Sequence, residues 1–102
     1  MTIATLQGQP IVIRLWEDRT RGELWVPAYD PVCLALIGDD FLRIASNNAV
    51  ENGERIFEFT ALLQGTHRIV FEKRMGWKFT AEARREFLVE VQGTSEHSAT
   101  SA

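Results

Sequence analysis

Apolar and polar residues alternate with a period of two along four runs of this sequence, and this alternation constrains the fold more than any other feature. The runs cover residues 11–16, 55–62, 67–73 and 85–91, and they are rich in β-branched and aromatic side chains. Successive side chains of a β-strand point to opposite faces of the sheet, so a period of two indicates strands with one buried face.

The inward positions of these runs predict the hydrophobic core. One face of each run is apolar, and Trp25 begins a further short apolar run. The predicted core consists of Ile11, Ile13, Leu15, Trp25, Phe57, Phe59, Ile69, Phe71, Phe87, Val89 and Val91.

The segments between the long runs carry turn residues and shorter candidate strands. We expect short strands at residues 3–6, 25–28 and 41–46, and we expect residues 31–40, "PVCLALIGDD", to form a short helical turn or a crossing connection. "QGT" at residues 64–66 indicates a tight hairpin turn. About seven to eight short antiparallel strands in a chain of this length predict an all-β fold, an immunoglobulin-like β-sandwich.

Length and composition limit the classes of protein to which the chain can belong. The 102 residues suit one domain, which we place at 1–92, followed by a small, polar tail at 93–102 that we expect to be disordered. A net charge of −3 argues against a nucleic-acid partner, and no apolar run approaches the length of a membrane span. Cys33 is the only cysteine, so an intrachain disulfide is impossible. Without a signal peptide at its start, we expect the chain in the cytoplasm, although secretion stays possible.

Candidate catalytic and metal-binding residues are few. Cys33 and His67 could form a nucleophile and base, but Cys33 sits in an apolar stretch that favours a buried, inert thiol. His67 and His97 lack the spacing of metal ligands, and Asp39 and Asp40 follow a glycine as turn residues do. The sequence also lacks a glycine-rich phosphate loop. We therefore expect no enzyme activity, no metal and no cofactor.

Three segments are longer, or carry more charged and aromatic side chains, than simple connections between strands need. They are "DRTRG" at residues 18–22, "NNAVENG" at residues 47–53, and the stretch 73–86, which contains Trp77. The simplest interpretation is that Trp77 covers the end of the core and that the arginines solvate a loop. In a seven-stranded sandwich, however, the connections after the second, fourth and sixth strands lie at the same end. A tryptophan beside arginines at such an end has the composition of a binding hot spot.

At these residues the sequence resembles the chagasin family of cysteine peptidase inhibitors. The resemblance extends over residues 8–91 and is best over residues 53–91, where "GTH" is followed ten positions later by Trp77 and then by "EFLVEV". "GQPIVIRLWEDRTRGELW" resembles the second strand, the first binding loop and the start of the third strand of that family. The resemblance implies a sandwich whose three loops at one end bind papain-like peptidases.

The resemblance also assigns partner-binding positions. The family loops read N-P-T-T-G, G-x-G-G and R-P-W, and they align with Asp18, Arg19, Thr20, Arg21, Gly22, Val50, Glu51, Asn52, Gly53, Arg74, Met75, Gly76 and Trp77. Thr20 is expected to form hydrogen bonds in the cleft, Gly22 to allow a positive φ, and Trp77 to be a flat anchor. Arg19 replaces the family's proline, so we expect a less preorganised first loop.

The sequence thus predicts a monomeric, reversible protein inhibitor of papain-like cysteine peptidases. Arg19 and Arg21 are expected to reach outward and to steer the inhibitor toward an acidic cleft rim. An alternative is a non-inhibitory immunoglobulin-like module that binds another protein through the same basic, aromatic end. A third reading, an enzyme with Cys33 as nucleophile, would need Cys33 exposed beside His67.

Overall fold

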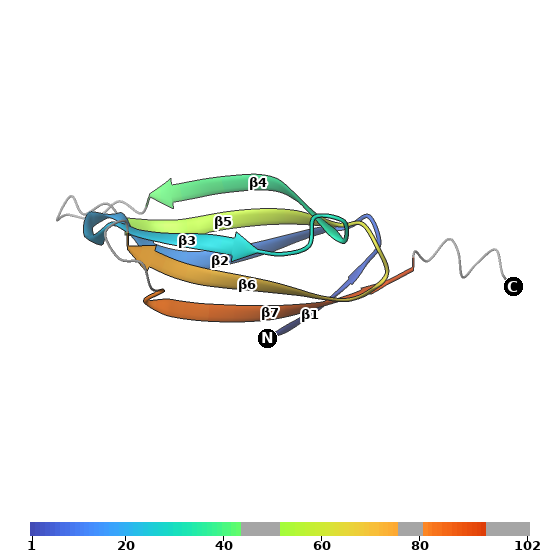
Figure 1. The fold of residues 1–102 in the computed structure, drawn as a ribbon. Helices are drawn as coiled ribbons and strands as arrows, with labels where there is room; N and C mark the ends of the chain where they lie inside the picture. Colours follow the sequence, from blue (N-terminus) through green and yellow to red (C-terminus); the bar gives the residue numbers. More distant parts are fainter. Residues whose placement is uncertain (44–51, 76–80, 94–102) are drawn as a thin grey trace, which may run out of the picture.

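The computed structural model describes residues 1–43, 52–75 and 81–93, and these contain seven strands and one 3₁₀ turn. The elements are β1 (Thr2–Leu6), β2 (Pro10–Asp18), η1 (Arg19–Arg21), β3 (Glu23–Ala28), β4 (Leu34–Arg43), β5 (Asn52–Ala61), β6 (Gly65–Met75) and β7 (Ala83–Gln92). They form a four-stranded sheet in the order β1-β7-β6-β3 and a three-stranded sheet in the order β2-β5-β4 (Figure 1). The predicted all-β sandwich is confirmed.

The core lies between the two sheets and is built from the alternating faces of the long strands. Every residue of the predicted core is buried there, with exposed fractions of 5% or less. Ala61, which the alternation places on the same face as Phe57 and Phe59, is buried as well, and so is Leu34, which the sequence did not single out. Within this core, the rings of Phe57 and Phe71 pack with their centroids 4.9 Å apart.

Two expectations about the strands need correction. Only the start of the segment 31–40 is a turn, in which the amides of Cys33 and Leu34 donate to the carbonyl oxygen of Asp30 at 3.0 Å. The remainder is strand, because β4 begins at Leu34 and pairs with β5 along its length. The register of β4 shifts between Leu36 and Gly38, and this irregularity breaks the alternation that would have revealed the strand. The strands are also not all antiparallel, since β1 pairs with β7 in parallel, with Ile3 opposite Val89.

The predicted tail at 93–102 lies outside the described residues except for Gly93, and β7 ends at Gln92. The described part of the chain contains no helix that is long and apolar enough to cross a membrane.

Candidate functional site

The strands β2, β4 and β6 end at the same end of the sandwich, opposite the β1–β2 and β5–β6 turns, and β3, β5 and β7 begin there (Figure 1). Within each sheet these strand ends lie side by side. The register pairs Asp18 with Asn52, Arg43 with Gly53, and Glu23 with Met75. We call this end the tip and define it by residues 17–23, 39–43, 52–55 and 73–75.

A tight turn joins the two sheets at the tip. Arg19–Arg21 form the 3₁₀ turn η1, and the amide of Gly22 donates a hydrogen bond to the carbonyl oxygen of Arg19 at 3.1 Å. Gly22 has a φ of 74°, so the positive φ predicted for this position is confirmed. This conformation favours glycine because other L-residues rarely adopt it. A shallow hollow of about 350 Å³ lies beside the turn and is lined by Arg19, Gly22, Glu23 and Leu24.

Beneath the turn lies Glu17, a fully buried carboxylate. Its Oε1 accepts a hydrogen bond from Arg19 Nε at 2.9 Å, and its Oε2 accepts one from Arg55 Nη1 and one from the backbone amide of Trp25, both at 2.8 Å. The guanidinium of Arg19 also lies over the ring of Phe41, 3.9 Å from its centroid. Arg19 therefore lies back against Glu17 and Phe41, although 38% of its side chain stays exposed, and the expectation that both arginines of the turn simply reach outward does not hold for this residue.

Arg55 connects Glu17 to a second carboxylate. Its Nε and Nη2 donate to the two carboxylate oxygens of Asp39 at 2.5 and 2.9 Å, and its side chain is only 13% exposed. These hydrogen bonds hold the pKa of Asp39 below its usual value and raise the pKa of Arg55. The four side chains of Asp39, Arg55, Glu17 and Arg19 thus form one continuous charged chain, which we call the tip network.

The second buried acid of the tip is Glu23, with an exposed fraction of 5%. Its Oε1 accepts a hydrogen bond from the amide of Asp18 at 3.3 Å and lies 3.7 Å from Lys73 Nζ, while its Oε2 lies 3.5 Å from Arg21 Nη1. The side chain of Arg21 is 64% exposed in spite of this pairing. Of the two arginines in the turn, Arg21 is therefore the more exposed, since 38% of the Arg19 side chain is exposed.

Two residues that the resemblance assigned to the partner surface lie in the interior. Met75 is buried, with an exposed fraction of 5%, and Gly53 is buried beside β4. A Cβ at Gly53 would collide with the carbonyl oxygen of Leu42, so glycine is required there by the close approach of two strands. Arg74 points to the opposite face from Met75 and pairs with Glu72 at 2.6 Å.

Several of the assigned positions are not covered by the structure. Val50, Glu51, Gly76 and Trp77 lie outside the described residues, as do the side chains of Thr20 and Asn52 and the stretch 47–51. Whether Trp77 is exposed therefore stays a prediction.

Sequence reasoning missed the charged residues on the inward faces of the strands. The alternation that buries Ile11, Ile13 and Leu15 continues to Glu17, and the alternation through Phe57 continues to Arg55. A charged residue that continues the apolar face of a strand could have been noticed in the sequence. Such a residue indicates an ion pair inside the fold, because a buried charge needs a partner.

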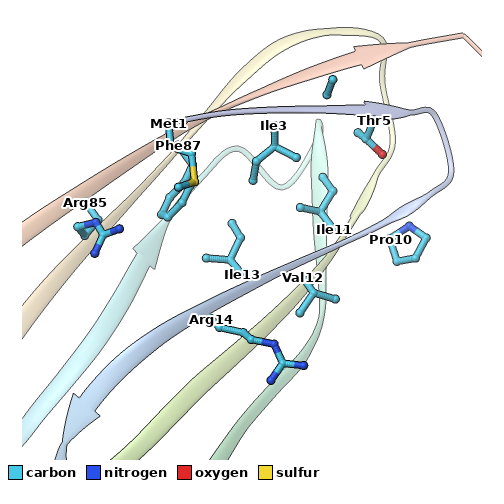
Figure 2. Close-up of a pocket in the computed structure, with 11 residues that line it drawn as sticks. Met1, Ile3, Thr5, Pro10, Ile11, Val12, Ile13, Arg14, Arg85 and Phe87 are labelled. Carbon is cyan, nitrogen blue, oxygen red and sulfur yellow. The ribbon is translucent and has the colours of Figure 1, made fainter.

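A groove lies away from the tip, between β1, β2 and β7. It has a volume of about 400 Å³, and Figure 2 shows Ile3, Ile11 and Ile13 within it. Arg14 and Arg85 also line it, but none of the sequence-predicted site residues does. Neither Cys33 nor His67 lines the groove, so it does not hold the proposed catalytic pair.

The candidate catalytic residues each have other partners. Cys33 is half-buried rather than fully buried, and its Sγ lies 3.6 Å from Asp30 Oδ2. Partial desolvation, with a further effect of the Asp30 carboxylate, raises the pKa of the thiol. His67 Nε2 forms its hydrogen bond with the carbonyl oxygen of Leu63 at 2.8 Å. Within the described residues no group of three or more histidine, cysteine or acidic side chains could hold a metal ion.

The comparisons with known proteins agree with the fold. The sequence matches the family described as Chagasin family peptidase inhibitor I42 over residues 5–91. The structure is similar to the crystal structure of the cysteine protease inhibitor EhICP2 from Entamoeba histolytica, with a TM-score of 0.80, 18% identity, and coverage of 89% of this chain and 86% of that one. It is also similar to the solution structure of Amebosin, with a TM-score of 0.59, 22% identity, and coverage of 89% and 88%. No curated protein sequence matches the chain.

Proposed function

Because the chain belongs to the chagasin family of peptidase inhibitors, we propose that it inhibits papain-like cysteine peptidases by placing its tip in their active-site cleft. Membership in this family makes the chain an inhibitor of cysteine peptidases and not an enzyme, as the sequence predicted. What we propose beyond family membership is that the target is a papain-like peptidase and that the tip is the surface that contacts it.

The observation that carries the proposal is that three strands end, and three others begin, at one end of the sandwich. The ends of β2, β4 and β6 lie beside the starts of β3, β5 and β7. Strand ends that a rigid sandwich holds side by side can present their residues to one cleft together, and a surface held in place in this way binds at a lower entropy cost.

The turn at residues 19–22 would be the leading element of this surface. Arg21 is exposed there, and the left-handed conformation of Gly22 reverses the chain within a single residue. Thr20, in the middle of the turn, could form hydrogen bonds within the cleft, and Trp77 would be an aromatic anchor. Neither contact forms a covalent bond, so inhibition would be reversible.

A titration against active-site-titrated papain and a panel of related peptidases tests the proposal, with a serine peptidase as the control. We expect competitive inhibition of the papain-like enzymes, with one inhibitor bound per enzyme, and no effect on the serine peptidase. A folded protein that inhibits none of the papain-like enzymes would overturn the proposal and favour a non-inhibitory binding module.

Two variants test the surface. Replacing Trp77 by Ala should weaken inhibition by about 2 kcal/mol or more while the fold stays intact. Replacing Arg21 by Gln should slow association, and this effect should shrink at high salt because exposed charges are screened. Arg68→Gln is a matched control, since Arg68 is also 64% exposed and also lies 3.5 Å from its acidic partner, but on β6 away from the tip. Inhibition that neither the Trp77 variant nor the Arg21 variant changes would place the contact surface elsewhere.

A further inference from the structure

The carboxylate of Glu17 occupies a position where an apolar residue would ordinarily complete the core. It follows Ile11, Ile13 and Leu15 on the inward face of β2, and it is fully buried. A buried carboxylate is unfavourable unless hydrogen bonds and opposite charges compensate its lost hydration. Its presence therefore requires a set of partners fixed around it.

Those partners come from three different parts of the fold. Arg19 belongs to the turn, Trp25 to β3 in the other sheet, and Arg55 to the central strand β5, and their donor atoms lie within 2.9 Å of the carboxylate oxygens. The carboxylate thus joins the turn to both sheets at once.

Arg55 is itself held rigidly. Its planar fork donates to both oxygens of Asp39 on β4, and its guanidinium lies over the ring of Phe57, 4.8 Å from the centroid. A bidentate pair fixes the orientation as well as the position of a guanidinium, which a single ammonium contact does not. The rigid end of the tip network is thus on β4 and β5, and its other end is Arg19 in the turn.

The other contacts of the turn are longer, since Glu23 lies 3.3 Å from the Asp18 amide and 3.5 Å from Arg21 Nη1. Within its backbone the bond from the Gly22 amide to the Arg19 carbonyl oxygen closes a single turn. An isolated turn of this kind is weakly populated in water, because one hydrogen bond must offset the entropy of several residues. Arg19, paired with Glu17 and seated over Phe41, ties the turn to the sandwich.

We infer that Glu17 and Arg55 are positioning residues for inhibition, which hold the turn at 19–22 in its binding conformation through Arg19. This inference rests on the proposed use of the tip. The turn lacks the proline that would make it rigid, and its ion pair with Glu17 compensates for this. The pair fixes the Arg19 side chain against the sandwich. Neither Glu17 nor Arg55 needs to touch the peptidase.

The test compares Glu17→Gln with Glu86→Gln, measuring inhibition, thermal unfolding and hydrogen exchange of the Gly22 amide. Both are acid-to-amide changes beside an arginine, but Glu86 lies on β7 outside the tip, 3.5 Å from Arg68, and is exposed. We expect Glu17→Gln to accelerate exchange at Gly22 and to raise the inhibition constant about tenfold, which matches the cost of ordering one or two side chains. Glu86→Gln should change neither quantity.

A double-mutant cycle separates positioning from direct contact. If Arg19 acts through Glu17, then Arg19→Met and Glu17→Gln together should weaken inhibition little more than either change alone. Additive effects would show that Arg19 acts without Glu17 and would overturn the inference. The effect of Glu17→Gln should also persist at high salt, unlike that of Arg21→Gln.

Should Glu17→Gln fail to fold, Arg55→Lys provides the same test, because it keeps the charge and loses the fork. A folded variant with faster exchange at Gly22 and an unchanged inhibition constant would overturn the inference while leaving the proposed function intact. If the wild-type protein inhibits no papain-like peptidase, the proposed function fails, and no role in inhibition is left for Glu17 and Arg55.

Discussion

The indole N–H of Trp25 donates a hydrogen bond to the backbone carbonyl oxygen of Trp16 at 2.7 Å. Trp25 lies on β3, an edge strand of the four-stranded sheet, and Trp16 lies on β2, an edge strand of the three-stranded sheet. The bond therefore ties the two sheets together directly below the turn. It also satisfies a carbonyl that β2 directs away from its partner strand, which would otherwise be open to another chain.

Replacing Trp25 by Phe keeps an aromatic ring in the core but removes this donor. We expect the free energy of unfolding to fall by about 1–2 kcal/mol, because the carbonyl of Trp16 is left without its partner. Trp16→Phe is the control, since it retains the backbone carbonyl and changes a side chain that is 51% exposed. Equal losses in urea unfolding would show that the hydrogen bond contributes nothing measurable.

Replacing Phe59 by Ala should cost about 3–5 kcal/mol, because its side chain is fully buried and a cavity would remain. The ring packs edge-on against Tyr29, with the centroids 5.1 Å apart, so the loss would loosen that contact too. Val12→Ala, on the solvent-facing side of β2, should change stability by less than about 0.5 kcal/mol. A loss below 1 kcal/mol for Phe59→Ala in denaturant unfolding would contradict the position of this residue in the core.

Replacing Gly53 by Ala should push β4 away from β5 at the tip. The new Cβ would meet the backbone of Leu42 and Arg43, which cannot move aside as a flexible side chain could. We expect a clear drop in melting temperature and faster amide exchange at Leu42. Gly38→Ala on β4 is the matched control, because its Cβ would lie 3.4 Å from the Cβ of Glu58. Similar melting temperatures for the two variants would be evidence against the close approach at Gly53.

The thiol of Cys33 should react slowly with a thiol reagent in native buffer. Partial desolvation and the neighbouring Asp30 raise its pKa, so less of the reactive thiolate is present at neutral pH. Asp30→Asn should speed labelling at constant pH, because it removes the negative charge and keeps an acceptor for the Val32 amide. Labelling of the wild-type protein as fast as free cysteine would contradict the prediction.

The Asp39–Arg55 pair should stabilise the fold down to low pH. The pKa of Asp39 is lowered in the folded protein, so its contribution is present above the unfolded-state pKa of about 3.9 and is lost as the pH falls through the folded value. Asp39→Asn should therefore flatten the loss of stability below about pH 4. Urea midpoints measured between about pH 5 and pH 2 test this, and parallel curves for both proteins would refute it.

The positions that the sequence predicted well are those governed by local alternation. Ile69 and Phe71, for example, belong to the buried face of β6 because neighbouring side chains of a strand must point to opposite faces. Where the chain departs from regular pairing, as between Leu36 and Gly38, the alternation fails and the strand was missed. The strand at β1 was predicted, but its parallel pairing with β7 was not, because that pairing joins residues more than 80 positions apart.

The sequence by itself determined the β-sandwich fold and the buried faces of the long strands. It also determined that Gly22 ends a tight turn with a positive φ. These follow from residue periodicity and backbone sterics, which act over a few neighbouring residues. Only the tertiary structure decided that Arg19 turns inward, because its partner Glu17 becomes buried only when β3 and β5 close around it. The pairing of Glu17 with Arg55 spans 38 positions of the sequence, and the partners of a buried charge are set by which strands lie side by side.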